Sequence, residues 1–180
     1  MEKFADYILS EENCTKKMEI VYYLQKRTGI FFDNSVILKT QIAKYFIEIM
    51  NLDVDKNLVL TACLLYDCKK NDSPQNLDKV KQYPKMSAEF LKTLGFSDRF
   101  CKICEQHSRY SEDLGEREKE SDVLELVDQF GGMLLHRPER MAFSVEDAIC
   151  LLEYRNLKGK YNRYLEQFKE FVRKMEGILI

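Results

Sequence analysis

The sequence predicts an all-α fold that forms one globular unit. Apolar residues recur at three- and four-residue steps in nearly every segment, which is the spacing of an amphipathic helix. No segment keeps the strict apolar and polar alternation of a strand and then meets a hairpin turn. Only three prolines and seven glycines interrupt the 180 residues, so we expect long helices.

The first predicted helix covers about residues 15–26, and Gly29 ends it. The next begins near Asn34 and Ser35, which are good N-cap residues, and carries apolar side chains at helical spacing. These apolar residues are Ile37, Leu38, Ile42, Ala43, Phe46 and Met50. We interpret 1–33 as an N-terminal helical extension packed on the main domain, which is 34–180.

A third helix, at about 55–69, is apolar on several sides. Its apolar residues are Leu58, Val59, Leu60, Ala62, Cys63, Leu64 and Leu65. Such continuous apolarity indicates burial all round, so we expect this to be the central helix. A start signal at Ser73 and Pro74 predicts that a short polar helix follows.

Pro84 lies in the first turn of the next predicted helix, which stops at Gly95. Ser97 caps a further helix at about 98–108. The stretch 109–121 is dominated by charge, and we interpret it as a solvated loop that leads into a helix start.

Three helices are expected in the last third of the chain, at about 122–134, 145–154 and 160–175. Ser144 precedes Asp147 by three residues, which resembles a capping box with Asp in place of the usual Glu. No internal repeat and no linker segment is recognisable.

Composition excludes several classes of function. The net charge is −2, and Lys and Arg are spread along the chain, so no concentrated basic face for nucleic acid is expected. No apolar run reaches the roughly 20 residues of a membrane span, and the first residues, MEKFADYILS, lack the apolar core of a signal peptide. The six cysteines mostly lie in apolar helical patterns, as reduced thiols do. We expect a cytoplasmic protein that binds neither nucleic acid nor membranes.

Two aspartates lie where the helical pattern predicts burial. Asp67 follows an apolar run in LLYDCKK, and Asp128 follows another in VLELVDQF. A buried carboxylate is costly unless it is paired, hydrogen-bonded or bound to a cation, and two of them repel each other. His107 is a third residue able to bind a metal. Pairing of Asp67 with a neighbouring lysine or backbone amide explains the pattern equally well.

These residues belong to motifs that resemble the HD domain superfamily of metal-dependent phosphohydrolases. LLYDCKK at 64–70 is similar to the superfamily motif LLHDIGK. YPKMSAEFL at 83–91 is similar to the HPEIGAEIL segment of the HD-GYP subfamily, and EQHSRY at 105–110 resembles its QHHERY. The similarity continues with LVDQF at 126–130, which resembles the VADVFDAL helix.

RPERMAFSVEDAI at 137–149 is close to the subfamily's RPYRKALSPEEAL, and all the motifs follow the family's order over about 39–154. The resemblance implies a compact helical bundle and descent from enzymes that hydrolyse cyclic di-GMP with several metal ions. The Tyr-Pro of the GYP signature is absent from 111–116. His136 has no ligand role in the family, and we expect it on the surface.

Carried over residue by residue, the resemblance implies that Asp67, His107 and Asp128 are retained metal ligands. The positions that have lost the family's histidine are Tyr66, Tyr83 and Ser108. A further histidine would fall in 38–40, where none is present. Neutral tyrosine is a poor ligand because its phenol titrates near pH 10, so we expect the multinuclear site to be lost.

The sequence allows two alternatives for the residues at the family's metal site. One divalent cation, Mg²⁺ or Mn²⁺, could be held with waters by Asp67, His107 and Asp128, because oxygen-preferring ions accept such a set. In the other state the hydroxyls of Tyr66 and Tyr83 bond to the two aspartates in a metal-free polar core. Separately, Cys101 and Cys104 with His107 have the spacing that begins a zinc site, although cysteines facing the core explain it as well.

Lys70 matches the lysine of the family motif and is our candidate for a catalytic lysine. Together with Arg137 and Arg140 it could bind a phosphate, but we favour arginines that brace their loop by pairing with acidic residues.

The prediction is a catalytically degenerate HD-GYP-like protein, a pseudoenzyme that acts as a binding or regulatory module in nucleotide-related signalling. It needs no cofactor, and its partner is an unidentified protein or a cyclic dinucleotide. The alternative is a divergent metal-dependent phosphohydrolase or phosphodiesterase that uses a single divalent cation. A third possibility is a cavity that binds a nucleotide without cleaving it.

Overall fold

The structure, a computed structural model, describes residues 4–70, 82–108, 115–138, 140–158 and 161–178. It confirms the all-α fold. Every regular element in these residues is a helix, apart from one isolated bridge between Arg137 and Arg140. None of the described helices is both long enough and apolar enough to cross a membrane.

The first four helices are α1 (Phe4–Ser10), α2 (Cys14–Thr28), α3 (Asn34–Met50) and α4 (Lys56–Leu65). Gly29 ends α2, as predicted, with a φ of 68° that favours glycine. The cap of α3 is Asp33, one residue before the predicted start, because its carboxylate accepts from the backbone N–H groups of Ser35 and Val36.

The other helices are α6 (Tyr83–Thr93), α7 (Asp98–Gln106), α8 (Lys119–Met133), α9 (Val145–Lys158) and α10 (Leu165–Ile178). Pro84 lies in the first turn of α6, and Ser97 caps α7, both as predicted. One half of the predicted capping box is confirmed, because Ser144 Oγ accepts from the N–H of Asp147 at 3.1 Å; the Asp147 carboxylate accepts from the Ser144 hydroxyl, at 2.9 Å. The polar helix predicted after Ser73 falls outside the described residues.

Helix α4 ends at Leu65 and does not continue to residue 69 as predicted. The chain leaves the helix because the next backbone groups find partners elsewhere in the fold. The carbonyl of Cys68 accepts from the N–H of Phe31 at 2.9 Å, and the N–H of Lys69 donates to Ser87 Oγ at 3.2 Å. Tyr66 and Asp67 therefore lie in turns that follow α4.

Three other helices also differ from their predicted bounds. Helix α8 begins at Lys119, before the predicted residue 122, and α9 continues past residue 154 to Lys158. Helix α10 starts at Leu165, after the predicted residue 160. The preceding Asn162 is buried and donates to the carbonyl of Asp122 at 2.8 Å, so this segment follows tertiary contacts before the helix begins.

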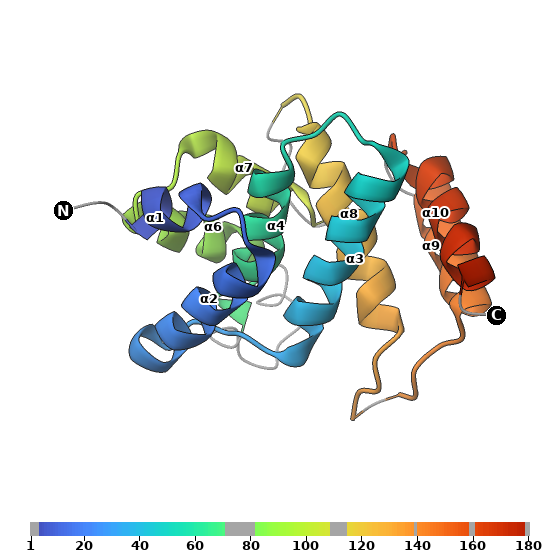
Figure 1. The fold of residues 1–180 in the computed structure, drawn as a ribbon, viewed down its shortest axis with the longest axis horizontal. Helices are drawn as coiled ribbons and strands as arrows, with labels where there is room; N and C mark the ends of the chain where they lie inside the picture. The colour runs from blue at the N-terminus through green and yellow to red at the C-terminus, as the bar shows by residue number, and fades with distance from the viewer. Residues whose placement is uncertain (1–3, 71–81, 109–114, 139, 159–160, 179–180) are drawn as a thin grey trace.

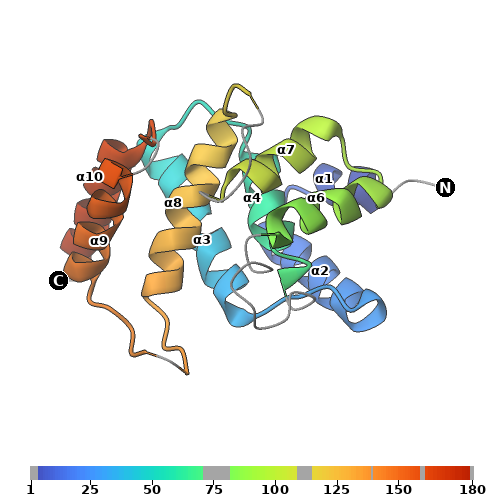
Figure 2. The same ribbon diagram turned by 180° about the vertical axis from the view of Figure 1, so that it is seen from behind.

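Helix α4 is the central helix, as predicted, because it packs against α1, α2, α3, α7 and α8. Figure 1 shows α1, α2, α6 and α7 on one side of it, and α9 and α10 at the opposite end of the molecule. From behind, α8 crosses in front of α3 (Figure 2). Helices α3, α4 and α8 pack against one another, and their side chains meet in the buried interior. Helices α1 and α2, which lie in 1–33, contact α4.

Candidate functional site

Helix α3, the turn after α4 and helix α8 bring Lys39, Tyr66 and Asp128 together, and we name these three residues the Lys39 cluster. Lys39 Nζ lies 2.7 Å from the hydroxyl oxygen of Tyr66 and 2.8 Å from Oδ1 of Asp128. The Tyr66 hydroxyl donates to the same carboxylate oxygen. Lys39 and Tyr66 are buried, whereas the Asp128 side chain is 23% exposed. One carboxylate oxygen thus receives two donors.

The charges in the Lys39 cluster stabilise each other. Burial alone would lower the pKa of Lys39, but Asp128 and more weakly Asp67 outweigh it and raise that pKa above its ordinary value. Burial would likewise raise the pKa of Asp128, yet the ammonium of Lys39 brings it well below its usual range. The pair is therefore ionised at neutral pH.

Sequence reasoning identified Tyr66 and Asp128 but missed Lys39. A signal was present, because Lys39 follows Val36 by three residues and precedes Ala43 by four, so it lies on the apolar side of its helix. Val36 and Ala43 are fully buried. A lysine on a buried stripe needs a carboxylate partner.

A glycine on α8 makes room for the Lys39 side chain. A Cβ atom added to Gly131 would lie 2.8 Å from Cγ of Lys39, whereas one added to Gly132 would meet only the guanidinium end of Arg137, at 3.2 Å. The stem of Lys39 cannot move aside because its Nζ is held by two partners.

We predict that Gly131→Ala lowers the free energy of unfolding by about 1–3 kcal/mol through overpacking. Gly132→Ala is the matched control, and it should be neutral or stabilising, because alanine is favoured over glycine in a helix by about 1 kcal/mol. Urea unfolding followed by circular dichroism measures both variants. Equal stability of the two would contradict the close approach of Lys39 to α8.

Asp67 is fully buried, and its surroundings differ from those of Asp128. Among the described residues neither of its carboxylate oxygens has a hydrogen-bond donor, and Lys70 Nζ lies 3.5 Å from Oδ2. Burial raises the pKa of Asp67, and the positive charges of Lys70 and Lys39 offset this only in part. The pairing with a neighbouring lysine that the sequence allowed is therefore present, at the outer limit of an ion pair.

His107 is buried beside the Lys39 cluster as a neutral imidazole. Its Nδ1 donates to the carbonyl of Cys104, which leaves Nε2 as an acceptor 3.4 Å from the hydroxyl of Tyr83. Its ring packs edge-on against that of Tyr66. Burial lowers the pKa of His107 to about 4. Tyr83 thus faces His107 and not Asp67, which corrects the expected bonding of both tyrosines to the aspartates; only Tyr66 bonds to one.

The low pKa of His107 predicts a loss of stability in mild acid. Unfolding frees the imidazole to bind a proton near pH 6.5, whereas the folded protein accepts one only near pH 4, so stability falls between these values. The advantage of wild type over His107→Gln should shrink by about 2.5 kcal/mol from pH 7 to pH 4.5. Urea unfolding at each pH measures it, with His136→Gln, a change of the exposed histidine, as control. A constant difference would contradict a neutral buried His107.

The residues present do not fit the multinuclear metal centre of the HD-GYP subfamily. Among the residues that the structure describes, no three His, Cys, Asp or Glu side chains lie close enough together to hold one ion. Lys39 instead places a positive charge against Asp128, which the family would use as a ligand. Ser108, at another family position, is buried. Cys101 and Cys104 are buried cysteines that form no zinc site with the other described residues.

Comparisons of this chain with family models, curated proteins and solved structures find no match. The resemblance to the HD-GYP subfamily is therefore carried by the ordered motifs of the sequence. Two of those motifs contribute Tyr66 and Asp128, which the fold places in direct contact.

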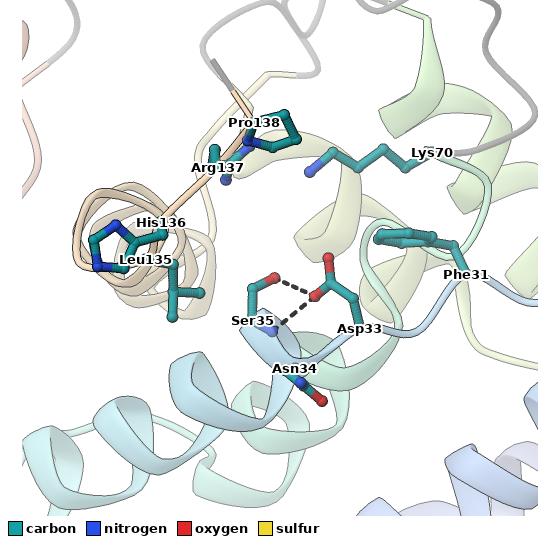
Figure 3. A pocket seen from close by; sticks show the side chains of 9 residues that line it. All are labelled: Phe31, Asp33, Asn34, Ser35, Lys70, Leu135, His136, Arg137 and Pro138. Carbon is teal, nitrogen blue, oxygen red and sulfur yellow. Dashed lines mark hydrogen bonds between the residues drawn. The ribbon is translucent and has the colours of Figure 1, made fainter. Parts of the chain in front are cut away.

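A pocket of about 600 Å³ opens between the start of α3, the turn after α4 and the segment that follows α8. Figure 3 shows the Lys70 side chain extending toward Arg137, which belongs to a different segment, above Asp33 and Ser35. The other lining residues are Phe31, Asn34, Leu135, His136 and Pro138. The Asp33 carboxylate already accepts hydrogen bonds from the backbone N–H groups at the start of α3. Arg137 forms no ion pair with the described residues. His136 is exposed, as predicted.

Arg140 does not line this pocket, so the structure does not bring together the three predicted phosphate-binding residues. Its guanidinium donates to the carbonyls of Gly132 at 2.6 Å and Met133 at 3.2 Å, at the end of α8. Arg140 therefore has the predicted bracing role, but its partners among the described residues are backbone carbonyls and not acidic side chains. Arg137 and Arg140 also pair through their backbones, so Arg140 supports the segment that presents Arg137.

Sequence reasoning also missed a second polar network, which lies beside α7 and the start of α8. Arg117 was assigned to a solvated loop, yet its side chain is only 19% exposed. It pairs with Asp122, lies 2.5 Å from Glu125 Oε2, and donates to the carbonyl of Gln106 at 2.7 Å. Asp122 and Glu125 were recognisable as acids on the inner side of a buried helix.

Proposed function

We propose that this chain is a catalytically degenerate HD-GYP-like protein whose helical scaffold serves as a binding or regulatory module. The observation that carries the proposal is the ammonium of Lys39, which is bonded to both Tyr66 and Asp128. It supplies the positive charge that a metal ion would supply to that aspartate in an active relative.

Electrostatics supports this reading. Two unit charges about 4 Å apart interact by about 4 kcal/mol at the effective dielectric constant of a protein surface, and the repulsion doubles for a divalent ion. A metal on Asp128 would have to bind that close to Lys39, or displace its ammonium from two good partners. Because Lys39 is buried, it has no water-filled space into which to withdraw.

The pocket beside this site supports a binding role. Lys70, whose ammonium also lies 3.5 Å from Asp67, and Arg137 both place a positive charge in its lining, and Phe31 and Leu135 add apolar surface. A ligand that carries a phosphate and a flat apolar group matches such a lining, because arginine and lysine both bind phosphate oxygens. A nucleotide, including a cyclic dinucleotide, is of this class, which agrees with a role in nucleotide-related signalling.

One observation favours the alternative, a phosphohydrolase that uses a single Mg²⁺ or Mn²⁺ ion. The carboxylate oxygens of Asp67 have no hydrogen-bond donor among the described residues, and a carboxylate in that state is suited to a proton or a cation. His107 is neutral, and its Nε2 is able to bind a metal if Tyr83 turns away.

Metal analysis and hydrolysis assays separate the two proposals. Protein purified without chelator is analysed for bound metal, and hydrolysis of cyclic di-GMP and of bis(p-nitrophenyl) phosphate is measured with added Mg²⁺ or Mn²⁺. We expect substoichiometric metal and no turnover. Stoichiometric metal together with turnover that Asp67→Ala abolishes would establish the enzyme and end the degenerate interpretation.

Calorimetric titration with cyclic di-GMP and with linear nucleotides tests the binding role. Binding should weaken in Lys70→Gln and in Arg137→Gln, and remain unchanged in Lys174→Gln, which removes an exposed cation on α10. Binding that is unaffected by both pocket variants would assign the ligand to another surface. Absence of binding by every nucleotide would leave a partner protein as the ligand of the module.

A further inference from the structure

Lys17 is a fully buried lysine that the proposed function does not use. It lies on α2, and its Nζ donates to the carbonyl of Ile8 at 2.5 Å and to Thr61 Oγ1 at 2.8 Å. Ile8 belongs to the last turn of α1, and Thr61 belongs to α4. One ammonium thus joins three helices, of which α1 and α2 lie on the N-terminal side of the central helix α4 in Figure 1.

Both partners of Lys17 are neutral, and it forms no ion pair among the described residues. The titratable groups around it are Glu11 in the link between α1 and α2, Cys14 on α2 and Asp55 at the start of α4. These act on it only from a distance. Burial therefore dominates and lowers the pKa of Lys17 to about 8.

Helix α1 has few other attachments. It contains seven residues, of which Ala5 and Ile8 are buried. The Asn57 amide donates to the carbonyl of Leu9, and the ring of Phe4 contacts that of Phe96 edge-on. A helix this short is not stable alone and depends on docking. Local release of α1 therefore costs less than unfolding the whole protein.

We propose that α1 is a strap whose docking on α2 and α4 is controlled by pH, because the docked state buries the charge of Lys17 without a counter-ion. Release of α1 returns the ammonium to water, where its charge is favoured. Docking is consequently tightest when Lys17 is neutral, and it weakens as pH falls. This device is independent of the Lys39 cluster and of the proposed function.

Hydrogen exchange of the intact protein at pH 7 and pH 9 tests the strap. After correction for the intrinsic chemical rate, the amides of α1 should be less protected than those of α3 at both pH values. Their protection should rise about tenfold from pH 7 to pH 9, which follows from a docked pKa of about 8 and an ordinary value of 10.5.

Two substitutions at the same position sharpen the test. In Lys17→Met no charge is buried, so the protection of α1 should be high and independent of pH. In Lys17→Arg the charge cannot be lost, so protection should be low and independent of pH. Lys16→Met, on an exposed neighbouring lysine, and Cys14→Ser should both retain the tenfold rise.

Three results would overturn the proposal. Equal protection of α1 and α3 would show that α1 opens only with global unfolding. Protection that does not change with pH in the wild type would show that Lys17 does not control docking. The same tenfold rise in Lys17→Met would assign the pH dependence to another group. If neither Lys17 variant folds, hydrogen exchange of the wild type at the two pH values still tests the proposal, because the first two of these results are measured on the wild type alone.

Discussion

Lys39→Met is expected to lower the free energy of unfolding by about 3–5 kcal/mol, the usual cost of removing one partner from a buried ion pair. Methionine fills nearly the same space as the lysine stem, so loss of packing contributes little. What remains is the carboxylate of Asp128 beside the buried hydroxyl of Tyr66, with its counter-ion removed. Urea unfolding followed by circular dichroism measures the change.

A double variant and a matched control identify the cause. Adding Asp128→Asn to Lys39→Met removes the uncompensated charge and should recover most of the lost stability. Lys44→Met is the control on the same helix, since Lys44 forms only a partly exposed pair with Glu48, worth about 1 kcal/mol or less. Similar losses for Lys39→Met and Lys44→Met would show that the Lys39 cluster is no buried ion pair.

The same variant tests whether the ammonium takes the place of a cation. If it does, Mn²⁺ should raise the unfolding temperature of Lys39→Met and leave that of the wild type unchanged, because only in the variant does the Asp128 carboxylate lack a positive partner. Equal shifts in both proteins would mean that Mn²⁺ binds elsewhere.

Arg117→Met is expected to cost about 3 kcal/mol, because the guanidinium serves two acids that are largely withdrawn from water. Asp122 would keep its pair with Arg163, at 2.5 Å, whereas Glu125 would keep only neutral partners, the amides of Asn162 and Gln129, each at 3.2 Å. Loss of the bond to the Gln106 carbonyl would also free the end of α7. The loss should therefore appear as reduced stability with the helical content retained.

The control for Arg117→Met is Lys119→Met, two residues along the chain. Lys119 pairs with Asp53, whose side chain is fully exposed, so its replacement should leave stability unchanged. Thermal unfolding of both variants in low and high salt adds a second readout. Salt should hardly change the loss caused by Arg117→Met, since a buried network is poorly screened. Equal losses of stability in the two variants would mean that Arg117 lies in a solvated loop, as the sequence indicated.

Most of the helices and several of their caps followed from local physical chemistry. Ser97 and Ser144 satisfy backbone donors within a few residues of themselves, and Gly29 adopts a conformation that other residues avoid. Such interactions depend on neighbours in the chain, so a pattern of residue types predicts them. Helix ends that depend on distant partners were wrong, as at Leu65, where Phe31 and Ser87 take over the following backbone groups.

The candidate site was only half predictable for the same reason. Burial of Asp67 followed from helical spacing and is confirmed, whereas Asp128, also predicted to be buried, has a side chain that is 23% exposed. The partners of these side chains could not be predicted, because periodicity indicates which side of a helix is buried and not which residue of another helix lies opposite. Tyr83 was expected near an aspartate and lies against His107.

The sequence by itself determined the all-α fold, the central position of α4 and the presence of two inward-facing aspartates. Each of these depends on apolar spacing and on the cost of burying charge, which act through residue type alone. Only the tertiary structure decided that Lys39 neutralises Asp128 while Asp67 receives just a distant lysine. That outcome depends on how closely α3 approaches α8 at Gly131, and such a distance is set by the packing of whole helices.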